Sequence, residues 1–118
     1  MTKIYCDIAD KRLIKIFNKK KIVKGFTTNP SLIRKAGARN YKSYCLELLN
    51  ITKKPISFEV FSDNEKGMIF QGNKISKWGK NVFVKVPYVN SKGHFTGKVI
   101  KELNNNKIKL NITAVYTA

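Results

Sequence analysis

The chain has 118 residues, of which 42% are hydrophobic and 11% aromatic, and its 24 Lys and Arg residues against 7 Asp and Glu residues give a formal net charge of +17. This length allows one domain, and the apolar content excludes a disordered polycation, because such chains lack the side chains needed to bury a core. Because no apolar run approaches the roughly 18–20 residues that span a bilayer and no signal-peptide core is present, we expect a cytoplasmic protein with no membrane partner.

The high charge first suggests a protein that binds nucleic acid or another anionic surface. Lysine supplies 21 of the 24 cations, however, and only Arg12, Arg34 and Arg39 are arginine, the residue better suited to forked contacts with phosphates and bases. Lys, Asn and Ile are all abundant, as translation of an A+T-rich genome would produce. We therefore expect no dedicated nucleic-acid role, and a non-enzymatic basic nucleic-acid-binding module stays the second alternative.

The cysteines and the histidine predict no metal site. Cys6, Cys45 and His94 are too few for a His/Cys zinc site. Cys6 alternates out of phase with Asp7 and is expected to be buried beneath a helix, whereas Cys45 falls on an apolar helical face, so both are expected to serve packing. We expect His94 to lie in a solvated loop, and we expect no metal or other cofactor.

Short apolar runs and longer helical patterns alternate along the chain. In chain order they predict a strand over Lys3–Ala9, a helix over Asp10–Lys19, a strand over Ile22–Thr28, a helix over Pro30–Thr52, a strand over Pro55–Phe61, a helix over Asn64–Lys77, a strand over Asn81–Pro87, a helix over about His94–Leu103 and a strand over Lys107–Thr113.

The first two helices carry recognisable start and stop signals. Asp10 is placed to cap the first helix, and Pro30 stands at the first position of the second helix, directly after Asn29. Gly37 predicts a short break within the second helix. The apolar side of the first helix is expected to comprise Leu13, Ile14, Ile16 and Phe17.

This β-α-β-α-β-α-β-α-β order, with about 20–30 residues per repeat, predicts parallel strands joined by right-handed helical crossovers. A doubly wound open sheet usually has a glycine-rich turn after its first strand, where this chain has the sequence from Asp7 to Asp10. A (β/α)₈ barrel instead gathers polar side chains at the carboxyl ends of its strands. We therefore predict an α/β fold, a truncated (β/α)₈ TIM barrel of about five βα units that occupies residues 1–118 as a single partial domain.

Every predicted strand delivers a polar side chain at its carboxyl end. These residues are Asp7, Thr27, Thr28, Asn29, Glu59, Lys85, Asn111 and Thr113. Strand alternation puts Lys85 on the face opposite Val84 and Val86, and in a barrel the valines would pack under helices while the lysine would point inward. The same counting separates Glu59 from its two apolar neighbours.

Lys85 is the most informative of these residues. Its neighbours Val84, Val86 and Pro87 make a charged ammonium costly to bury, and burial favours the neutral amine. A neutral amine can attack a carbonyl and form a Schiff base, which accepts electrons when a neighbouring carbon–carbon bond breaks. The alternative is that Lys85 reaches solvent or pairs with Glu59.

Aldol chemistry also needs groups that move protons and bind hydroxyls. Glu59 and Asp7 could divide the proton transfers, and Thr113 could hold a water molecule. The amides of Asn29 and Asn111 can both donate and accept, which suits a sugar-like substrate; their alternative roles are capping of a helix and of a strand end.

Five stretches of the chain resemble, in order and spacing, those of the transaldolase family, particularly its small-subunit branch, which includes fructose-6-phosphate aldolase. They are Tyr5–Ala9, Gly25–Leu32, Ser57–Val60, Val82–Pro87 and Leu110–Tyr116. Thr-Thr-Asn-Pro-Ser and Val-Lys-Val-Pro are specific when they occur together. The resemblance implies a (β/α)₈ class I aldolase without a metal, in which Lys85 matches the Schiff-base lysine.

The resemblance also implies the other site residues. Glu59 and Thr113 match the pair that holds the catalytic water, and Asp7 matches the acid/base carboxylate. The substrate-contacting positions of the family match Thr27, Asn29 and Asn111. The implied reaction transfers a dihydroxyacetone unit between sugar phosphates in the pentose phosphate pathway, and the implied assembly is a homo-oligomer when the protein is full length.

The resemblance implies Glu at the position of Glu59 in transaldolases and Gln in fructose-6-phosphate aldolases. Glu59 therefore favours a transaldolase over the first alternative, a fructose-6-phosphate aldolase-like lyase. Another Schiff-base aldolase is the remaining enzyme alternative. A full barrel needs about 200–250 residues, so we expect the N-terminal portion of one, without the family's phosphate-binding Ser and Arg. Residues 88–97 also depart from the family pattern.

Overall fold

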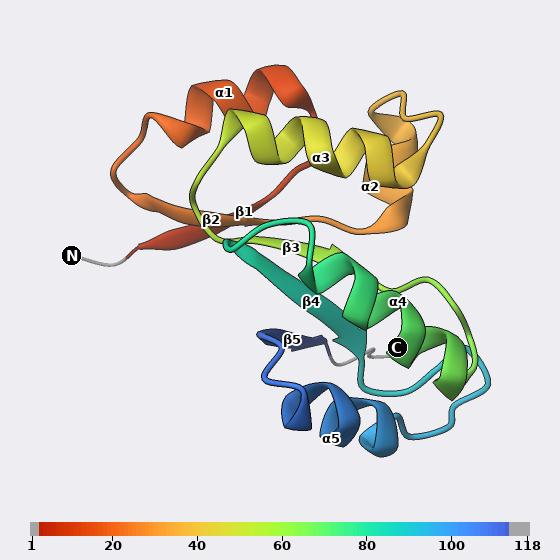
Figure 1. Cartoon of the computed structure of the whole chain (residues 1–118). Helices are drawn as coiled ribbons and strands as arrows, with labels where there is room; N and C mark the ends of the chain where they lie inside the picture. The colour runs from red at the N-terminus through yellow and green to blue at the C-terminus, as the bar shows by residue number, and fades with distance from the viewer. Residues whose placement is uncertain (1–2, 114–118) are drawn as a thin grey trace. The chain divides into compact units, whose positions relative to one another are not determined.

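The computed structural model describes residues 3–113, in which strands and helices alternate as predicted (Figure 1). The elements are β1 (Ile4–Asp7), α1 (Lys11–Asn18), β2 (Val23–Thr27), α2 (Pro30–Lys35), α3 (Tyr41–Ile51), β3 (Ile56–Glu59), α4 (Glu65–Ser76), β4 (Val82–Pro87), α5 (Gly97–Asn105) and β5 (Leu110–Thr113). Residues 114–116 of the last family-like stretch lie outside the described residues.

The sheet is parallel, and its strand order follows the chain order. The pairs β1–β2, β2–β3 and β4–β5 are each in parallel register. The predicted α/β class is confirmed, with about five βα units of the (β/α)₈ type. The chain divides into two compact units, Met1–Phe58 and Glu59–Ala118.

In the first unit, helices α1, α2 and α3 lie on one side of β1 and β2 (Figure 1). The side chains of Ile14, Phe26, Cys45 and Leu48 are completely buried between these layers. Burial raises the pKa of the Cys45 thiol to about 12, which keeps it protonated and inert, in agreement with its predicted packing role. Cys6 is only half-buried, so the prediction that it is buried was wrong.

The buried side of α1 is narrower than predicted. Ile14 is completely buried and Phe17 is half-buried, whereas Leu13 is exposed and Ile16 is 47% exposed. Successive helical residues are about 100° apart, so Ile16 lies about 200° from Ile14 around the helix. The helix therefore packs through the narrow side that contains Ile14 and Phe17.

The predicted break in the second helix is wider than expected, because residues 36–40 separate α2 from α3. Gly37 adopts a φ of 98°, which residues with a side chain rarely reach, and its N–H donates to the carbonyl of Arg34 (3.0 Å). Asn40 then starts α3, where its Oδ1 accepts a hydrogen bond from the Ser43 N–H (2.9 Å).

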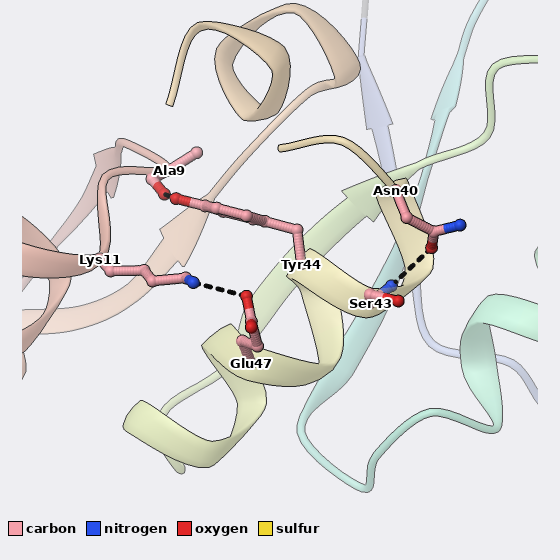
Figure 2. Close-up of polar contacts among 6 residues, drawn as sticks. All are labelled: Ala9, Lys11, Asn40, Ser43, Tyr44 and Glu47. Atoms are coloured by element: carbon pink, nitrogen blue, oxygen red, sulfur yellow. Dashed lines mark hydrogen bonds and ion pairs between the residues drawn. The ribbon is translucent and has the colours of Figure 1, made fainter. Parts of the chain in front are cut away.

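Tyr44 connects α3 to the chain segment that follows β1 (Figure 2). Its hydroxyl donates to the carbonyl of Ala9 (2.7 Å), and both residues are buried. Lys11 lies over the Tyr44 ring, 4.8 Å from its centroid, and pairs with Glu47. The Lys11 and Glu47 side chains are 40% and 56% exposed, so the ion pair stabilises little and the Tyr44 bond is the stronger restraint.

The second unit is built around β4. Its buried side chains include Met68 and Ile75 of α4, Val84 of β4, and Val99 and Leu103 of α5. Asn64 caps α4 by accepting a hydrogen bond from the Gly67 N–H at 2.7 Å.

Helix α5 begins at Gly97 and not at His94, because the preceding residues form a small hairpin. Val89 and Phe95 form an antiparallel bridge, and the N–H of Thr96 donates to the carbonyl of Tyr88 (3.0 Å). The ring of Phe95 therefore lies outside the helix and is 60% exposed.

Candidate active site

The carboxyl ends of β1 and β2 bring together two of the predicted residues of the first unit. Asp7 and Thr27 are direct register partners, and the Thr27 hydroxyl donates to Asp7 Oδ1 at 2.9 Å. Asp7 is exposed and Thr27 is half-buried. The carboxylate is therefore accessible to a ligand while one of its oxygens is held by a neighbouring strand.

Asn29 follows β2 and serves as the N-cap of α2. Its Oδ1 accepts a hydrogen bond from the Leu32 N–H at 2.8 Å, so a substrate contact from this side chain would come from the Nδ2 donor. The preceding residue, Thr28, is completely buried and donates through Oγ1 to the Ser57 carbonyl (2.7 Å). This bond fixes the end of β2 against β3 and so sets the position of Asn29.

The ends of β4 and β5 bring together a second group of predicted residues. Lys85 pairs directly with Asn111, and Pro87 pairs with Thr113 two positions further along the strands. Directly opposed residues of adjacent strands present their side chains to the same face of a sheet. Lys85, Asn111 and Thr113 therefore share one face of the β4–β5 pair.

The opposite face of β4 contains its valines, as predicted. Val84 and Val86 are completely buried, whereas Lys85 between them is half-buried. The lysine therefore lies on the side of the strand away from the helical core of the second unit, where an amine can meet a ligand.

Glu59 joins this second group through the backbone. The N–H of Val60 donates to the carbonyl of Lys85 at 3.1 Å, which puts the residue before Val60 beside the Lys85 level of β4. Phe58 and Val60 are buried and Glu59 is half-buried, so Glu59 faces away from its two apolar neighbours, as predicted. Glu59, Lys85 and Asn111 thus occur at one level of the second unit.

Two loops that follow strand ends in the second unit are tied together by Asp63. Its Oδ1 accepts from the Ser91 N–H (3.0 Å), its Oδ2 accepts from the Ser91 hydroxyl (2.6 Å), and Asn90 Nδ2 donates to its carbonyl (3.2 Å). The hydrogen bonds from Ser91 hold the pKa of the Asp63 carboxyl below its ordinary value. The loop after β3 and the loop after β4 therefore form one connected rim.

Sequence reasoning missed the residues that shape this rim. Gln71 of α4 accepts through Oε1 from the N–H groups of Phe61 and Ser62, at 2.8 and 2.9 Å. On the hairpin, Tyr88 and Phe95 form an aromatic pair with ring centroids 4.9 Å apart, and both rings are largely exposed. No periodicity or motif identifies these contacts, because each joins residues from different segments.

His94 is exposed in this loop, as predicted. Within residues 3–113, no three His, Cys, Asp or Glu side chains come close enough together to hold a metal ion. None of the helices described in this range is long and apolar enough to cross a membrane.

Comparison with known proteins identifies one matching family. The profile described as transaldolase/fructose-6-phosphate aldolase matches residues 4–118. The chain is similar to probable transaldolases from Methanococcus maripaludis, Clostridium acetobutylicum and Clostridioides difficile, with 36%, 37% and 38% identity over 116 residues. These alignments cover 98% of the chain and 52%, 52% and 51% of the respective relatives, so the chain spans about half their length.

Proposed function

Because the chain belongs to the transaldolase/fructose-6-phosphate aldolase family, we propose that Lys85 forms a Schiff base with a ketose phosphate and that the protein transfers a dihydroxyacetone unit to an aldose phosphate. The observation that best supports this role is the position of Lys85, opposite Asn111 and away from the buried valines of β4. We assign the reaction to the pentose phosphate pathway in the cytoplasm, and no metal or other cofactor takes part.

The amine of Lys85 attacks the carbonyl carbon of the ketose, and the carbonyl oxygen takes up protons and leaves as water. The resulting iminium accepts the electron pair of the bond between the third and fourth carbons while a base removes the proton of the hydroxyl on the fourth carbon. An aldose phosphate departs and an enamine stays on Lys85. The enamine then attacks the aldehyde of the acceptor, and water hydrolyses the new Schiff base to release the product.

The other residues divide the proton transfers and substrate contacts. Asp7 is the acid/base carboxylate, and the hydrogen bond from Thr27 supports this assignment because it orients the carboxylate. Glu59 and Thr113 hold the water that is released and later consumed.

Amides bind the hydroxyl groups of the ketose in this proposal. Asn111 is suited to this contact because it lies opposite Lys85, and Asn29 can contribute its Nδ2 group while its oxygen caps α2. Both contacts would orient the bond to be broken relative to the iminium.

Borohydride trapping tests the Schiff base directly. The protein is incubated with fructose 6-phosphate, and sodium borohydride reduces the iminium to a stable secondary amine that mass spectrometry detects. We expect a single adduct, mapped to the peptide that contains Lys85 and absent from Lys85→Ala. The matched control is Lys109→Ala, which removes an exposed lysine from the same unit and is expected to keep the adduct. An adduct that survives Lys85→Ala at full yield would refute the assignment.

The acceptor distinguishes transfer from simple cleavage. A transaldolase passes the dihydroxyacetone unit to erythrose 4-phosphate, whereas a fructose-6-phosphate aldolase releases it as free dihydroxyacetone. Glu59 supports the transferase. We expect sedoheptulose 7-phosphate to form from fructose 6-phosphate and erythrose 4-phosphate, and release of dihydroxyacetone without transfer would favour the lyase.

A further inference from the structure

A pocket lined mostly by lysine residues lies in the first unit at the amino ends of β1 and β2. Its volume is about 630 Å³, and six of the eight described residues that line it are lysines. They are Lys3, Lys19, Lys20, Lys21, Lys24 and Lys54. Because β1 and β2 are parallel, this lysine pocket and the pair formed by Asp7 and Thr27 lie at opposite ends of the two strands.

The positive charge of the lysine pocket is not balanced locally. No acidic residue occurs among the lining residues within the described part of the chain. By contrast, the pocket of about 600 Å³ beside α1 and α3 is lined by both cationic side chains and the carboxylates of Asp10 and Glu47. Like charges gathered around one cavity raise its potential and attract multivalent anions.

Hydrogen bonds hold Lys54, one of the lining residues of the lysine pocket, in place. Lys54 Nζ donates to the carbonyls of Lys20 (2.8 Å) and Val23 (2.7 Å), which holds its charge in place. The backbone N–H of Lys54 donates to Thr52 Oγ1 (3.0 Å), and the Thr52 hydroxyl donates to Asn18 Oδ1 (2.6 Å). Binding therefore does not have to order Lys54, which lowers the entropic cost of binding.

The lysines at the mouth of the pocket are exposed and chemically uniform. Lys19, Lys20, Lys21 and Lys24 are all exposed, and each ends in a compact ammonium on a flexible stem. Lysine ammonium groups bind as point charges, whereas the planar guanidinium of arginine binds one oxyanion through two parallel hydrogen bonds. Several lysines around one pocket therefore suit a ligand that carries several charged groups in a row.

From these observations we propose that the lysine pocket binds a linear chain of phosphate groups, as found in a nucleoside triphosphate or an inorganic polyphosphate. This site is separate from the proposed aldol chemistry and does not depend on it. The shared chemistry is a row of phosphates, and the two sources differ in whether a nucleoside adds to the affinity.

Calorimetric titration of the full chain with orthophosphate, pyrophosphate and tripolyphosphate at low salt tests the proposal. We expect tripolyphosphate to bind about tenfold or more tightly than orthophosphate, because each added phosphate meets a further lysine. The triple variant Lys19→Gln, Lys21→Gln and Lys24→Gln is expected to weaken tripolyphosphate binding by about tenfold or more.

The matched control removes the same number of exposed charges from the second unit. Lys66→Gln, Lys98→Gln and Lys101→Gln in one variant are expected to change tripolyphosphate binding by less than about twofold. Equal weakening in the two triple variants would overturn the proposal, because it would show attraction by overall charge. Absence of tripolyphosphate binding to the unaltered chain would overturn it as well.

ATP identifies the source of the phosphate chain. ATP that binds more tightly than tripolyphosphate, and that tripolyphosphate displaces, would support the pocket and assign it to a nucleotide. If ATP binds no more tightly than tripolyphosphate and each ligand displaces the other, the result would support the pocket and assign it to inorganic polyphosphate. ATP binding that the pocket variant leaves unchanged, together with unchanged tripolyphosphate binding, would overturn the site.

Discussion

Tyr44 shows how a single side chain can set the path of the backbone toward a candidate site. Its hydroxyl bond to the Ala9 carbonyl restrains the chain two residues beyond Asp7, and burial raises the pKa of the phenol. The raised pKa means that this residue stabilises the fold fully below its ordinary value of 10.0 and that the stabilisation is lost as the pH rises above it.

Tyr44→Phe is expected to destabilise the protein by about 1–2 kcal/mol, because the buried Ala9 carbonyl loses its donor. Urea unfolding monitored by circular dichroism measures the change. Tyr5→Phe is the matched control, since Tyr5 is 48% exposed in the same unit, and we expect it to change stability by less than about 0.5 kcal/mol. Equal effects of the two variants would contradict a special role for the Tyr44 hydroxyl.

Glu59→Gln tests the residue at which we expect the two activities of the family to differ. Glutamine is the residue that the resemblance implies for the lyases at this position, so we expect the ratio of transfer to simple cleavage to fall by about tenfold or more. Product analysis with and without erythrose 4-phosphate measures the ratio. Glu65→Gln, at the exposed start of α4, is expected to leave the ratio unchanged. An unchanged ratio in Glu59→Gln would argue against its assignment.

At the scale of elements, the loops after β3 and β4 act together through Asp63 and Ser91. The hydrogen bonds from Ser91 lower the pKa of Asp63 from its ordinary value of 3.8. A lowered folded-state pKa stabilises the loops above about pH 4, and this stabilisation is lost as the pH falls through the folded-state pKa.

Ser91→Ala is expected to move the pKa of Asp63 up toward its ordinary value, because the hydroxyl donor is lost while the backbone donor stays. Carboxyl titration by nuclear magnetic resonance measures the shift, and hydrogen exchange across residues 88–96 is expected to become faster. A titration curve identical to that of the unaltered protein would show that the hydroxyl bond does not stabilise the carboxylate in solution.

Local patterns predicted the alternation of strands and helices and the face of Lys85, because both follow from the periodicity of a few neighbouring residues. They failed where distant residues decide the outcome. Tyr44 meets Ala9 35 positions away, and Ser91 meets Asp63 28 positions away, so neither contact has a local signal. The late start of α5 has the same origin, since the hairpin competes with the helix for Phe95.

At the scale of the whole molecule, the sequence predicts one partial domain over residues 1–118, and the structure shows two compact units within it. Each unit has its own buried side chains, with Leu48 in the first and Val84 in the second. Amide hydrogen exchange, measured segment by segment, distinguishes unfolding of the two units together from unfolding of each unit by itself.

Leu48→Ala removes a completely buried side chain from the first unit and is expected to cost about 2–5 kcal/mol. Native-state hydrogen exchange should then show a larger loss of protection in β2 and α3 than in β4 and α5. Val84→Ala is the matched variant of the second unit, and the pattern is expected to reverse. Equal loss of protection throughout in both variants would show one cooperative domain, as the sequence predicts.

The alternation along β4 has a consequence for how this protein can change over generations. Val84 and Val86 are completely buried and are constrained by packing, whereas Lys85 between them is half-buried on the face where the proposed function places the ligand. Substitutions on the lysine face of β4 therefore leave the packing of its valine face nearly unchanged. A lineage could acquire a new substrate by replacing residues on the lysine face of the strand while its thermal tolerance stays as inherited.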